Sequence, residues 1–337
     1  MNSRAANSYD FVRFAAASAV LFSHHFALSG LSEPPVPGYG EDFGKLAVEV
    51  FFSLSGFLIC ESLLRSSDSA NFFTARFLRI YPNLTFALVL TSVATLVFYE
   101  NYNHRWEHVR YVLRNLVMFL KDVTYDVPGI FEDLRAHALN GPLWSLPSEM
   151  WLYTLLFILF KLAGSRVFLW VAASAIATSF GWRLVEHTQF FRLGSFFLSG
   201  AVLACAWPHL RQYALRGGVV AIILLLSMPD ILRNSLVHSM LLAATVVGIG
   251  SSKKMAWFAK GGDASYGMYI FAWPIQQFSI LLVNGFWQSM ITAFIVTALI
   301  GYSTWHAFEK KAMGVRHRLA DRLRQPFLLH RRQMNKA

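Results

Sequence analysis

The feature that most limits how this chain can fold is a series of long apolar stretches that recur along its whole length. The hydrocarbon core of a bilayer is about 30 Å thick and is crossed by about 20 helical residues, and several stretches reach that length. Their continuous apolar character is typical of helices and excludes the alternating pattern of an outer-membrane barrel. With 55% hydrophobic and only 15% charged residues, the chain is too apolar for an ordinary soluble domain. The sequence therefore predicts an all-α, polytopic membrane helical bundle.

The spans that we predict are ten in number and lie at residues 9–29, 44–64, 80–99, 145–163, 167–182, 190–206, 217–230, 235–250, 265–283 and 287–307. An even number of spans leaves both termini on one side of the membrane. With that side taken as cytoplasmic, 20 of the 30 Lys and Arg residues lie in cytoplasmic segments and seven in external ones, as the positive-inside rule requires. The membrane thus explains the net charge of +11, and we expect no nucleic-acid partner. The pattern predicts a multi-pass protein of the bacterial cytoplasmic (inner) membrane, with membrane lipid as its surroundings.

The segments outside the spans give the domain organisation. Residues 1–310 are predicted as one integral-membrane domain and residues 311–337 as a basic cytoplasmic tail. Residues 100–144 are predicted as one external loop, with a re-entrant or interfacial helix near 112–120 that is too short to span. The first span lacks a basic leader and a cleavage site, so we expect it to be retained. The chain ends about 30 residues after the last span, so we expect no appended extracytoplasmic domain.

Ionisable residues inside the first span are the strongest indication of function. Arg13 and His24 lie eleven residues apart in the otherwise apolar segment 10–26, which puts them on nearly the same helix face and roughly 16 Å apart along the axis. Ionisable groups in spanning helices usually face the bundle interior or a water path. The alternative is that Arg13 reaches the inner headgroups and His24 makes a structural hydrogen bond between helices.

Two carboxylates are further candidates. Glu49 lies near the outer end of the second span, at a depth similar to that of His24 if the first two helices pair antiparallel, and would there orient the imidazole. The alternative is a solvated carboxylate at the rim. Glu149 lies in the first turn of the fourth span, where it either interacts with the positive helix end or acts as a base or hydrogen-bond acceptor for a sugar hydroxyl.

Two arginines precede the third span in the segment RFLRIYP. Arg76 and Arg79 are three residues apart, so their side chains point the same way on a helix. Two guanidinium groups so placed suit a bidentate contact with a phosphate or pyrophosphate group that arrives from the cytosol. The alternative is that they only anchor the cytoplasmic side, as positive-inside residues do.

The order and spacing of these motifs resemble the membrane-bound acyltransferase family 3, which O-acylates sugars and exported or lipid-linked polysaccharides. The resemblance covers nearly the whole chain and rests on Arg13 with ten residues before His24, VEVFFSLSGFLI, RFLRIYP, LWSLPSE, FFLSGAVLA, SYGMYI and Glu309. It implies a ten-helix acyltransferase core, acyl-coenzyme A as cytosolic donor, no permanently bound cofactor or metal, and His24 as the central catalytic residue. Positions matching the family's other site residues are Arg13, Arg76, Arg79 and Glu149.

The sequence departs from the family pattern at three places. Ala47 and Glu49 replace the usual Gly and Asp, and Pro147 and Met150 interrupt the pattern around Glu149. Ala272 stands where many members have a second His. The resemblance therefore leaves His24 without that partner.

The sequence thus predicts a membrane O-acyltransferase, more specifically an O-acetyltransferase, that moves an acyl group from acetyl-CoA or another acyl-CoA to a hydroxyl of a glycan acceptor. That acceptor is an exopolysaccharide, a lipopolysaccharide-type glycan or another lipid-linked sugar. Such a reaction needs a base of near-neutral pKa, donors for the oxyanion and a dry channel, and His24 serves either as the base or as a transient acyl carrier. The alternative class is a proton-coupled transporter with a relay of Arg13, His24 and Glu49. The oligomeric state, the acyl group and the glycan stay open.

Overall fold

The computed structural model describes residues 7–66, 68–99, 105–185, 189–316 and 318–322. Within these residues the regular structure is helical, apart from an isolated antiparallel bridge between Pro35 and Asp42 in the loop after the first helix. The all-helical architecture predicted from the sequence is confirmed.

The α-helices follow one another along the chain as α1 (Tyr9–Leu28), α2 (Phe43–Arg65), α3 (Ser69–Phe98), α4 (Arg105–Leu116), α5 (Ser145–Ala163), α6 (Val167–Leu184), α7 (Gln189–Leu210), α8 (Ala214–Leu226), α9 (Leu236–Gly250), α10 (Ser265–Leu282), α11 (Phe286–Thr304) and α12 (Lys310–Gly314). Short 3-10 turns link several of them: η1 (Gly141–Trp144), η2 (Gly164–Arg166), η3 (Arg211–Tyr213), η4 (Asp230–Leu232) and η5 (Ala256–Gly261). The segment η6 (Trp305–Glu309) between α11 and α12 is a π-helical turn.

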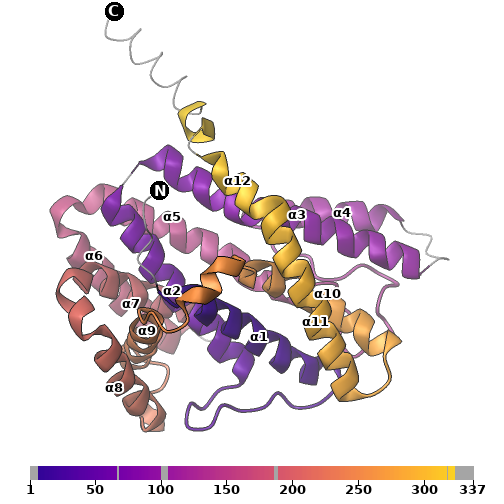
Figure 1. Ribbon diagram of the computed structural model, residues 1–337, viewed down its shortest axis with the longest axis horizontal. Coiled ribbons are helices and arrows are strands. Elements are labelled where there is room, and N and C mark those ends of the chain that lie inside the picture. Colours follow the sequence, from indigo (N-terminus) through magenta and orange to yellow (C-terminus); the bar gives the residue numbers. More distant parts are fainter. Residues whose placement is uncertain (1–6, 67, 100–104, 186–188, 317, 323–337) are drawn as a thin grey trace, which may run out of the picture.

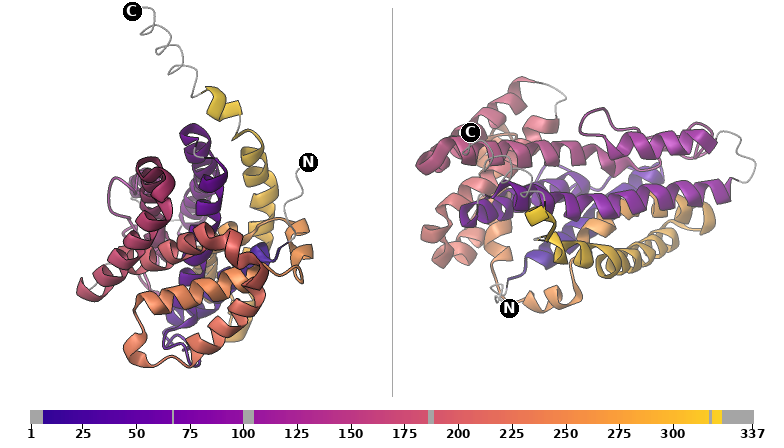
Figure 2. Two further views of the ribbon diagram at one scale, coloured as in Figure 1. Left: turned by 90° about the vertical axis from the view of Figure 1, so that its left-hand side faces the viewer. Right: turned by 90° about the horizontal axis from the view of Figure 1, so that it is seen from above.

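The helices α1 and α2 form the centre of the bundle (Figure 1). α2 packs against α7 and α1 packs against α10, while α6 to α9 form one flank, with α6 against α7 and α8 against α9. α10 packs against α11, and α4 packs along α3 on the other flank (Figures 1 and 2). The first span thus contacts helices from both the middle and the end of the sequence.

Two glycines allow α2 and α7 to approach each other closely. A Cβ atom at Gly56 would lie 1.8 Å from the carbonyl oxygen of Phe197, and one at Gly200 would lie 2.0 Å from that of Ser53. Neither glycine has room for a side chain, so the two backbones touch directly, as small residues permit in membrane helix pairs. In the same contact, Cys60 and Cys205 are free thiols whose Sγ atoms lie 3.6 Å apart and share a hydrogen bond.

Each of the ten predicted spans overlaps one α-helix, but several boundaries were wrong: α7 continues to Leu210 instead of 206, and α8 covers Ala214–Leu226 instead of 217–230. The third helix begins at Ser69 and not near residue 80, so Arg76 and Arg79 lie in a helix that was predicted as a cytoplasmic loop. A hydropathy window misses these first turns because they are polar and basic although helical. The helix in the loop 100–144 is α4 at Arg105–Leu116, which begins and ends earlier than the predicted 112–120.

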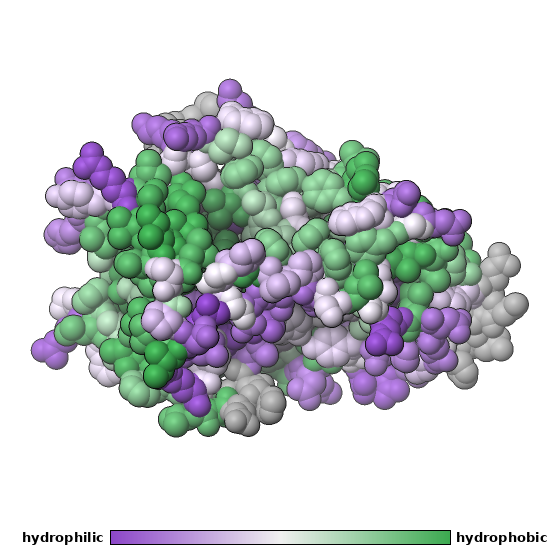
Figure 3. Space-filling model, turned by 90° about the horizontal axis from the view of Figure 1, so that it is seen from below, coloured by the Kyte–Doolittle hydropathy of each residue, from purple (hydrophilic) through white to green (hydrophobic). Residues whose placement is uncertain are grey.

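Apolar side chains on the outside of the bundle identify a multi-pass membrane protein. Six helical stretches of the described chain are long and apolar enough to cross a bilayer. Three of these each contain two α-helices: Gly141–Leu184, Gln189–Leu226 and Phe286–Gly314. Large residues such as Leu162 and Leu184 are 82% and 78% exposed, and hydrophobic side chains cover broad areas of the face in Figure 3. Such continuous apolar surface suits lipid. The number of ten spans and the side of the termini stay predictions, and the predicted tail 311–337 lies largely outside the described residues.

Candidate active site

His24 lies in the last turns of α1, where it faces α10. Its ring meets the Trp273 ring edge to face, with centroids 5.2 Å apart and an interplanar angle of 78°. Its Nδ1 atom is buried and has no hydrogen-bond partner among the described residues. The carboxylates of Glu33 and Asp42 lie close enough to act on His24 electrostatically, and Glu33 accepts a hydrogen bond from Ser23 Oγ on the same helix. The imidazole therefore keeps a ring nitrogen available for a reacting group.

His25 has different surroundings although it is the next residue. Its Nε2 atom lies 3.0 Å from Ser289 Oγ of α11, its ring packs against Phe286 at 5.2 Å, and the side chain is fully buried. Adjacent residues point about 100° apart on a helix, so α1 directs one histidine to α10 and the other to α11. His25 acts as an interhelical hydrogen-bonding residue.

Glu49 is buried on the face of α2 that meets α7, where it contacts Arg192 and not His24. Its Oε1 atom accepts a hydrogen bond from Arg192 Nε at 2.9 Å, and its Oε2 atom accepts one from the hydroxyl of Tyr39. Burial, followed by the charge of Glu49, raises the pKa of the Tyr39 phenol well above its ordinary value. Both predicted arrangements of Glu49 were wrong. It does not orient His24, because its oxygens hold α2 to α7 and to the α1–α2 loop, and it is no solvated rim carboxylate, because it is only 1% exposed.

Arg13 and Arg79 meet at one carboxylate, that of Asp263 in the turn before α10. Asp263 Oδ2 lies 3.1 Å from Arg13 Nη1 and 2.6 Å from Arg79 Nη2. Burial alone would raise the pKa of Asp263, but Arg79 and Arg13 outweigh it and lower the pKa to about 2. Arg13 also lies 3.8 Å from Asp10, one turn earlier on α1.

A second carboxylate completes the surroundings of Arg79. Glu309 Oε2 lies 2.5 Å from Arg79 Nη1, and Glu309 Oε1 accepts a hydrogen bond from Asn83 Nδ2 at 2.9 Å. Glu309 is fully buried, because the chain forms the π-helical turn η6 there instead of continuing α11 regularly. Such turns are rare and occur mostly at functional positions. Arg79 is therefore held between two carboxylates.

Arg76 lies one turn before Arg79 but has different partners. Its guanidinium lies 5.8 Å from the ring centroid of Tyr153 on α5, and its Nε atom is buried without a hydrogen-bond partner among the described residues. Tyr153 donates its hydroxyl hydrogen to Glu149, and Ser55 of α2 lies 3.5 Å from the same carboxylate oxygen. Arg76 thus faces a polar group of Tyr153, Glu149 and Ser55 while no carboxylate of the described chain forms an ion pair with it.

The two arginines of RFLRIYP therefore do not form one two-pronged clamp. Arg79 is occupied by Asp263 and Glu309, and only Arg76 keeps nitrogen atoms free of carboxylates in the described structure. Their joint role at a phosphate group stays a prediction.

A family model described as an acyltransferase domain matches residues 7–306 of this chain. The chain belongs to acyltransferase family 3. The match includes the helices that carry His24, Glu49, Arg76 and Glu149, and it confirms the resemblance found in the sequence.

This acyltransferase is similar in sequence to two bacterial or phage proteins. An O-acetyl transferase of Shigella phage Sf6 is 26% identical over 319 residues, which cover 90% of this chain and 95% of the phage protein. Nodulation protein 10 of Rhizobium leguminosarum bv. viciae is 30% identical over 194 residues, 54% of this chain and 51% of that protein. No solved structure matches the chain.

Several residues around the site were missed in the sequence. Asp263 precedes the SYGMYI motif, Trp273 follows Ala272, and Tyr153 ends the segment that begins with LWSLPSE. Each lies within a few residues of a recognised motif, which is the signal that would have found them. Glu33 and Arg192 had no such signal, because their contacts are made across long distances in the sequence. Ser145, the first residue of α5, was also missed, and its hydroxyl shares a 2.7 Å hydrogen bond with that of Tyr269.

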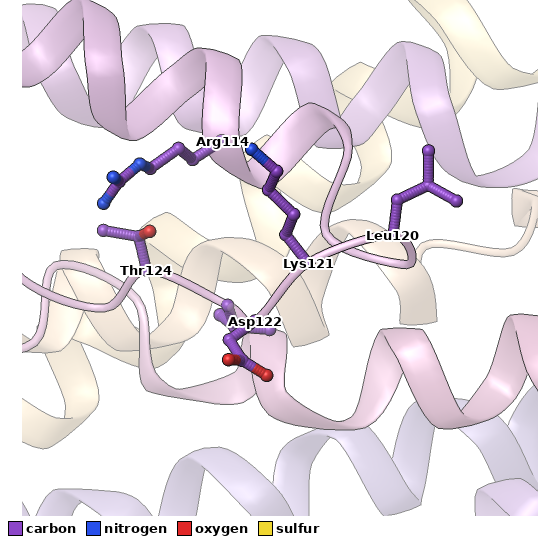
Figure 4. Close-up of a pocket in the computed structure, with 6 residues that line it drawn as sticks. Arg114, Leu120, Lys121, Asp122 and Thr124 are labelled. Atoms are coloured by element: carbon purple, nitrogen blue, oxygen red, sulfur yellow. The ribbon is translucent and has the colours of Figure 1, made fainter.

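A surface pocket of about 610 Å³ lies apart from these residues, at the end of α4. It is lined by Arg114, Leu120, Lys121, Asp122, Val123 and Thr124. Lys121 extends toward the helix that carries Arg114, whereas Asp122 points the opposite way (Figure 4). None of the predicted site residues lines this pocket. In the described chain no group of three or more His, Cys, Asp or Glu side chains gathers as metal ligands.

Proposed function

We propose that this acyltransferase is a membrane O-acetyltransferase that moves the acetyl group of acetyl-CoA to a hydroxyl of a polysaccharide or lipid-linked sugar. The observation that carries the proposal is the alignment with the phage O-acetyl transferase over 90% of this chain. The geometry supports it, because an acyl transfer to an alcohol needs a base in a dry site, and His24 has a buried ring nitrogen with no hydrogen-bond partner in the described part of the chain.

The chemistry that we propose centres on His24. The imidazole takes the proton of the sugar hydroxyl, the alkoxide oxygen attacks the thioester carbonyl, and the thiolate of coenzyme A leaves with the proton that His24 returns. In the second route the imidazole attacks the thioester carbonyl and expels coenzyme A as its thiolate. The sugar hydroxyl then attacks the acyl-histidine, which frees the imidazole, and the hydroxyl proton leaves with the thiolate. In both routes we assign the orientation of the His24 imidazole to Glu33, which acts on it electrostatically. Glu49 does not serve this purpose, because its oxygens are bonded to Arg192 and Tyr39.

The donor site that we propose uses Arg76 for an anionic phosphate of acetyl-CoA. Arg76 keeps nitrogen atoms that no described carboxylate occupies, and a charge-assisted contact to phosphate satisfies them. Arg13 and Arg79 add positive charge beside it. Glu149 holds the Tyr153 hydroxyl next to Arg76, which places this carboxylate on the donor side of the site in our proposal. Glu49 has a structural role in it, as the ion pair between α2 and α7.

The test is acetyl transfer from radiolabelled acetyl-CoA in membranes that contain this protein, with and without a glycan fraction. We expect label to enter the glycan only when both the protein and the glycan are present. A matched preparation with His24→Gln keeps a hydrogen-bonding side chain but not the basicity. Label in the glycan at the normal rate with this variant would refute the assignment of His24, and glycan-independent consumption of acetyl-CoA would refute the acceptor class.

The proposal also includes a location in the bacterial cytoplasmic membrane with both termini in the cytoplasm. It is supported by the excess of Lys and Arg in the segments assigned to that side. Reporters fused after residue 337 and within 65–68 should read cytoplasmic, and one near residue 125 should read external. A cytoplasmic signal at residue 125 would refute the ten-span topology.

A further inference from the structure

We propose that Asp263 is a positioning residue of the acyltransferase, which fixes Arg13 and Arg79 beside the proposed donor residue Arg76 and so keeps the bound acyl donor in its reacting orientation. The inference rests on the donor site proposed above and adds to it a residue that lies between helices α1, α3 and α10. Asp263 is 6% exposed, and it is 250 residues from Arg13 and 184 from Arg79 in the sequence.

Both carboxylate oxygens of Asp263 are occupied. Oδ2 accepts from Arg13 at 3.1 Å and from Arg79 at 2.6 Å. Oδ1 accepts from the backbone N–H of Ser265 at 3.2 Å and from the Ser265 hydroxyl. The contacts of Ser265 fix the carboxylate to the first residue of α10, and the carboxylate in turn fixes two guanidinium groups. Asp263 is therefore itself fixed to α10 and contacts two guanidinium groups, as a positioning residue requires.

Aromatic rings as well as carboxylates restrain the guanidinium group of Arg79. Its guanidinium carbon lies 5.9 Å from the centroid of the Tyr266 ring and 5.5 Å from that of Trp305, while Glu309 takes the nitrogen that Asp263 does not. Two carboxylates and two nearby aromatic rings together limit the orientations that this planar cation can adopt. It does not turn toward a ligand in the way that an unpaired arginine does.

The charges around Asp263 predict how its loss should change donor binding and turnover. Arg13 and Arg79 both act electrostatically on Arg76 and on Glu149, so the site is a compact set of charges. Removing the negative charge of Asp263 makes the site more positive, which favours binding of an anionic donor. The same change removes the carboxylate contact that Arg13 and Arg79 share, so the two guanidinium groups are less firmly fixed and the reacting geometry is harmed. Binding and turnover should therefore change in opposite directions.

The first experiment compares Asp263→Asn with Asp263→Glu and with the exposed Asp133→Asn as matched control, at equal amounts of folded protein. For Asp263→Asn we expect kcat to fall about 10-fold to 100-fold while the KM for acetyl-CoA is unchanged or lower. Asp263→Glu, which keeps the charge, should recover part of kcat, and the control should match the wild type. A raised KM with normal kcat would overturn the inference. Normal kinetics with less folded protein would also overturn it, because Asp263 would then have a structural role only.

The second experiment does not depend on the donor. The unfolding temperature of the purified protein is measured in detergent for Arg13→Gln, Asp263→Asn and the double variant. If Asp263 holds Arg13, the double variant should lose clearly less than the sum of the two single shifts. Additive shifts would overturn the linkage. Failure of acetyl-CoA turnover in the wild type would refute the proposed function but leave this measurement as a valid test of the linkage.

Discussion

The surroundings of His24 and those of Arg79 differ in how fully their polar atoms are paired. Arg79 has a carboxylate at two of its nitrogens, and its guanidinium carbon lies 5.9 and 5.5 Å from the centroids of two aromatic rings. His24 has an aromatic neighbour and a buried nitrogen without a partner among the described residues. A buried polar group that is left unpaired costs free energy, so selection for stability alone does not explain it. We therefore infer that the contacts of Arg79 hold helices together, whereas the region around His24 is available to a substrate.

The largest effect on activity should come from replacing His24, whose Nδ1 atom has no partner in the described chain. In His24→Ala we expect glycan acetylation to fall about 10²-fold to 10⁴-fold if the imidazole is a base, and to vanish if it carries the acyl group. Acetyl transfer is measured at matched membrane abundance. His25→Ala serves as the neighbouring control, since it loses a hydrogen bond to Ser289 and should lose folded protein more than turnover. Near-normal transfer by His24→Ala would show that the unpaired imidazole of His24 takes no part in the reaction.

Arg79→Gln, which removes a residue with paired nitrogen atoms, should lower stability in addition to lowering turnover. The substitution leaves Asp263 and Glu309 buried without their shared cation, and breaking a buried ion pair in this way costs ~3–5 kcal/mol. Thermal unfolding in detergent measures the loss. A variant as stable as the wild type would show that these ion pairs contribute little to holding α3, α10 and α11 together.

Arg76→Gln, one turn away, should show the opposite pattern. Arg76 has no ion-pair partner in the described chain, so its loss should leave the unfolding temperature nearly unchanged. If it contacts a donor phosphate, the KM for acetyl-CoA should rise by the equivalent of ~1.5–3 kcal/mol. Arg76→Lys is the control and should recover part of the loss. An unchanged KM would remove Arg76 from the donor site.

The smallest effect concerns pH. The pKa of Asp263 is about 2 in the folded protein, below the ordinary 3.8, so its ion pairs stabilise the fold above about pH 4 and are lost as the pH falls toward 2. The difference corresponds to about 2 kcal/mol. Unfolding temperatures measured between pH 2 and pH 7 should fall less steeply at the acid end in Asp263→Asn than in the wild type. Equal pH profiles would show that this carboxylate is not held by the arginines.

The helices themselves follow closely from the sequence, because apolar periodicity and length act locally. α5 begins and ends at residues 145 and 163, as the apolar stretch predicts, and α1 differs by one residue from its predicted end. The start of α3 was missed because its first turns carry Arg76 and Arg79, whose charges lower the mean hydropathy without disfavouring a helix. The spacing of Arg13 and His24 was enough to put both on α1 and to separate His24 from His25.

The partners of the site residues were decided only by the tertiary structure. Helix α2 presents Glu49 to α7 and not to α1, and the π-helical turn η6 places Glu309 in the interior beside Arg79. Asp263 reaches Arg13 across 250 positions of sequence. The sequence by itself determined an all-helical membrane bundle of acyltransferase type and which helices carry the ionisable residues, because hydrophobic transfer and helix periodicity depend on neighbouring residues. Which charges meet depends on the rotation and packing of helices that are distant in the chain, and side-chain packing sets that rotation only when the whole bundle assembles.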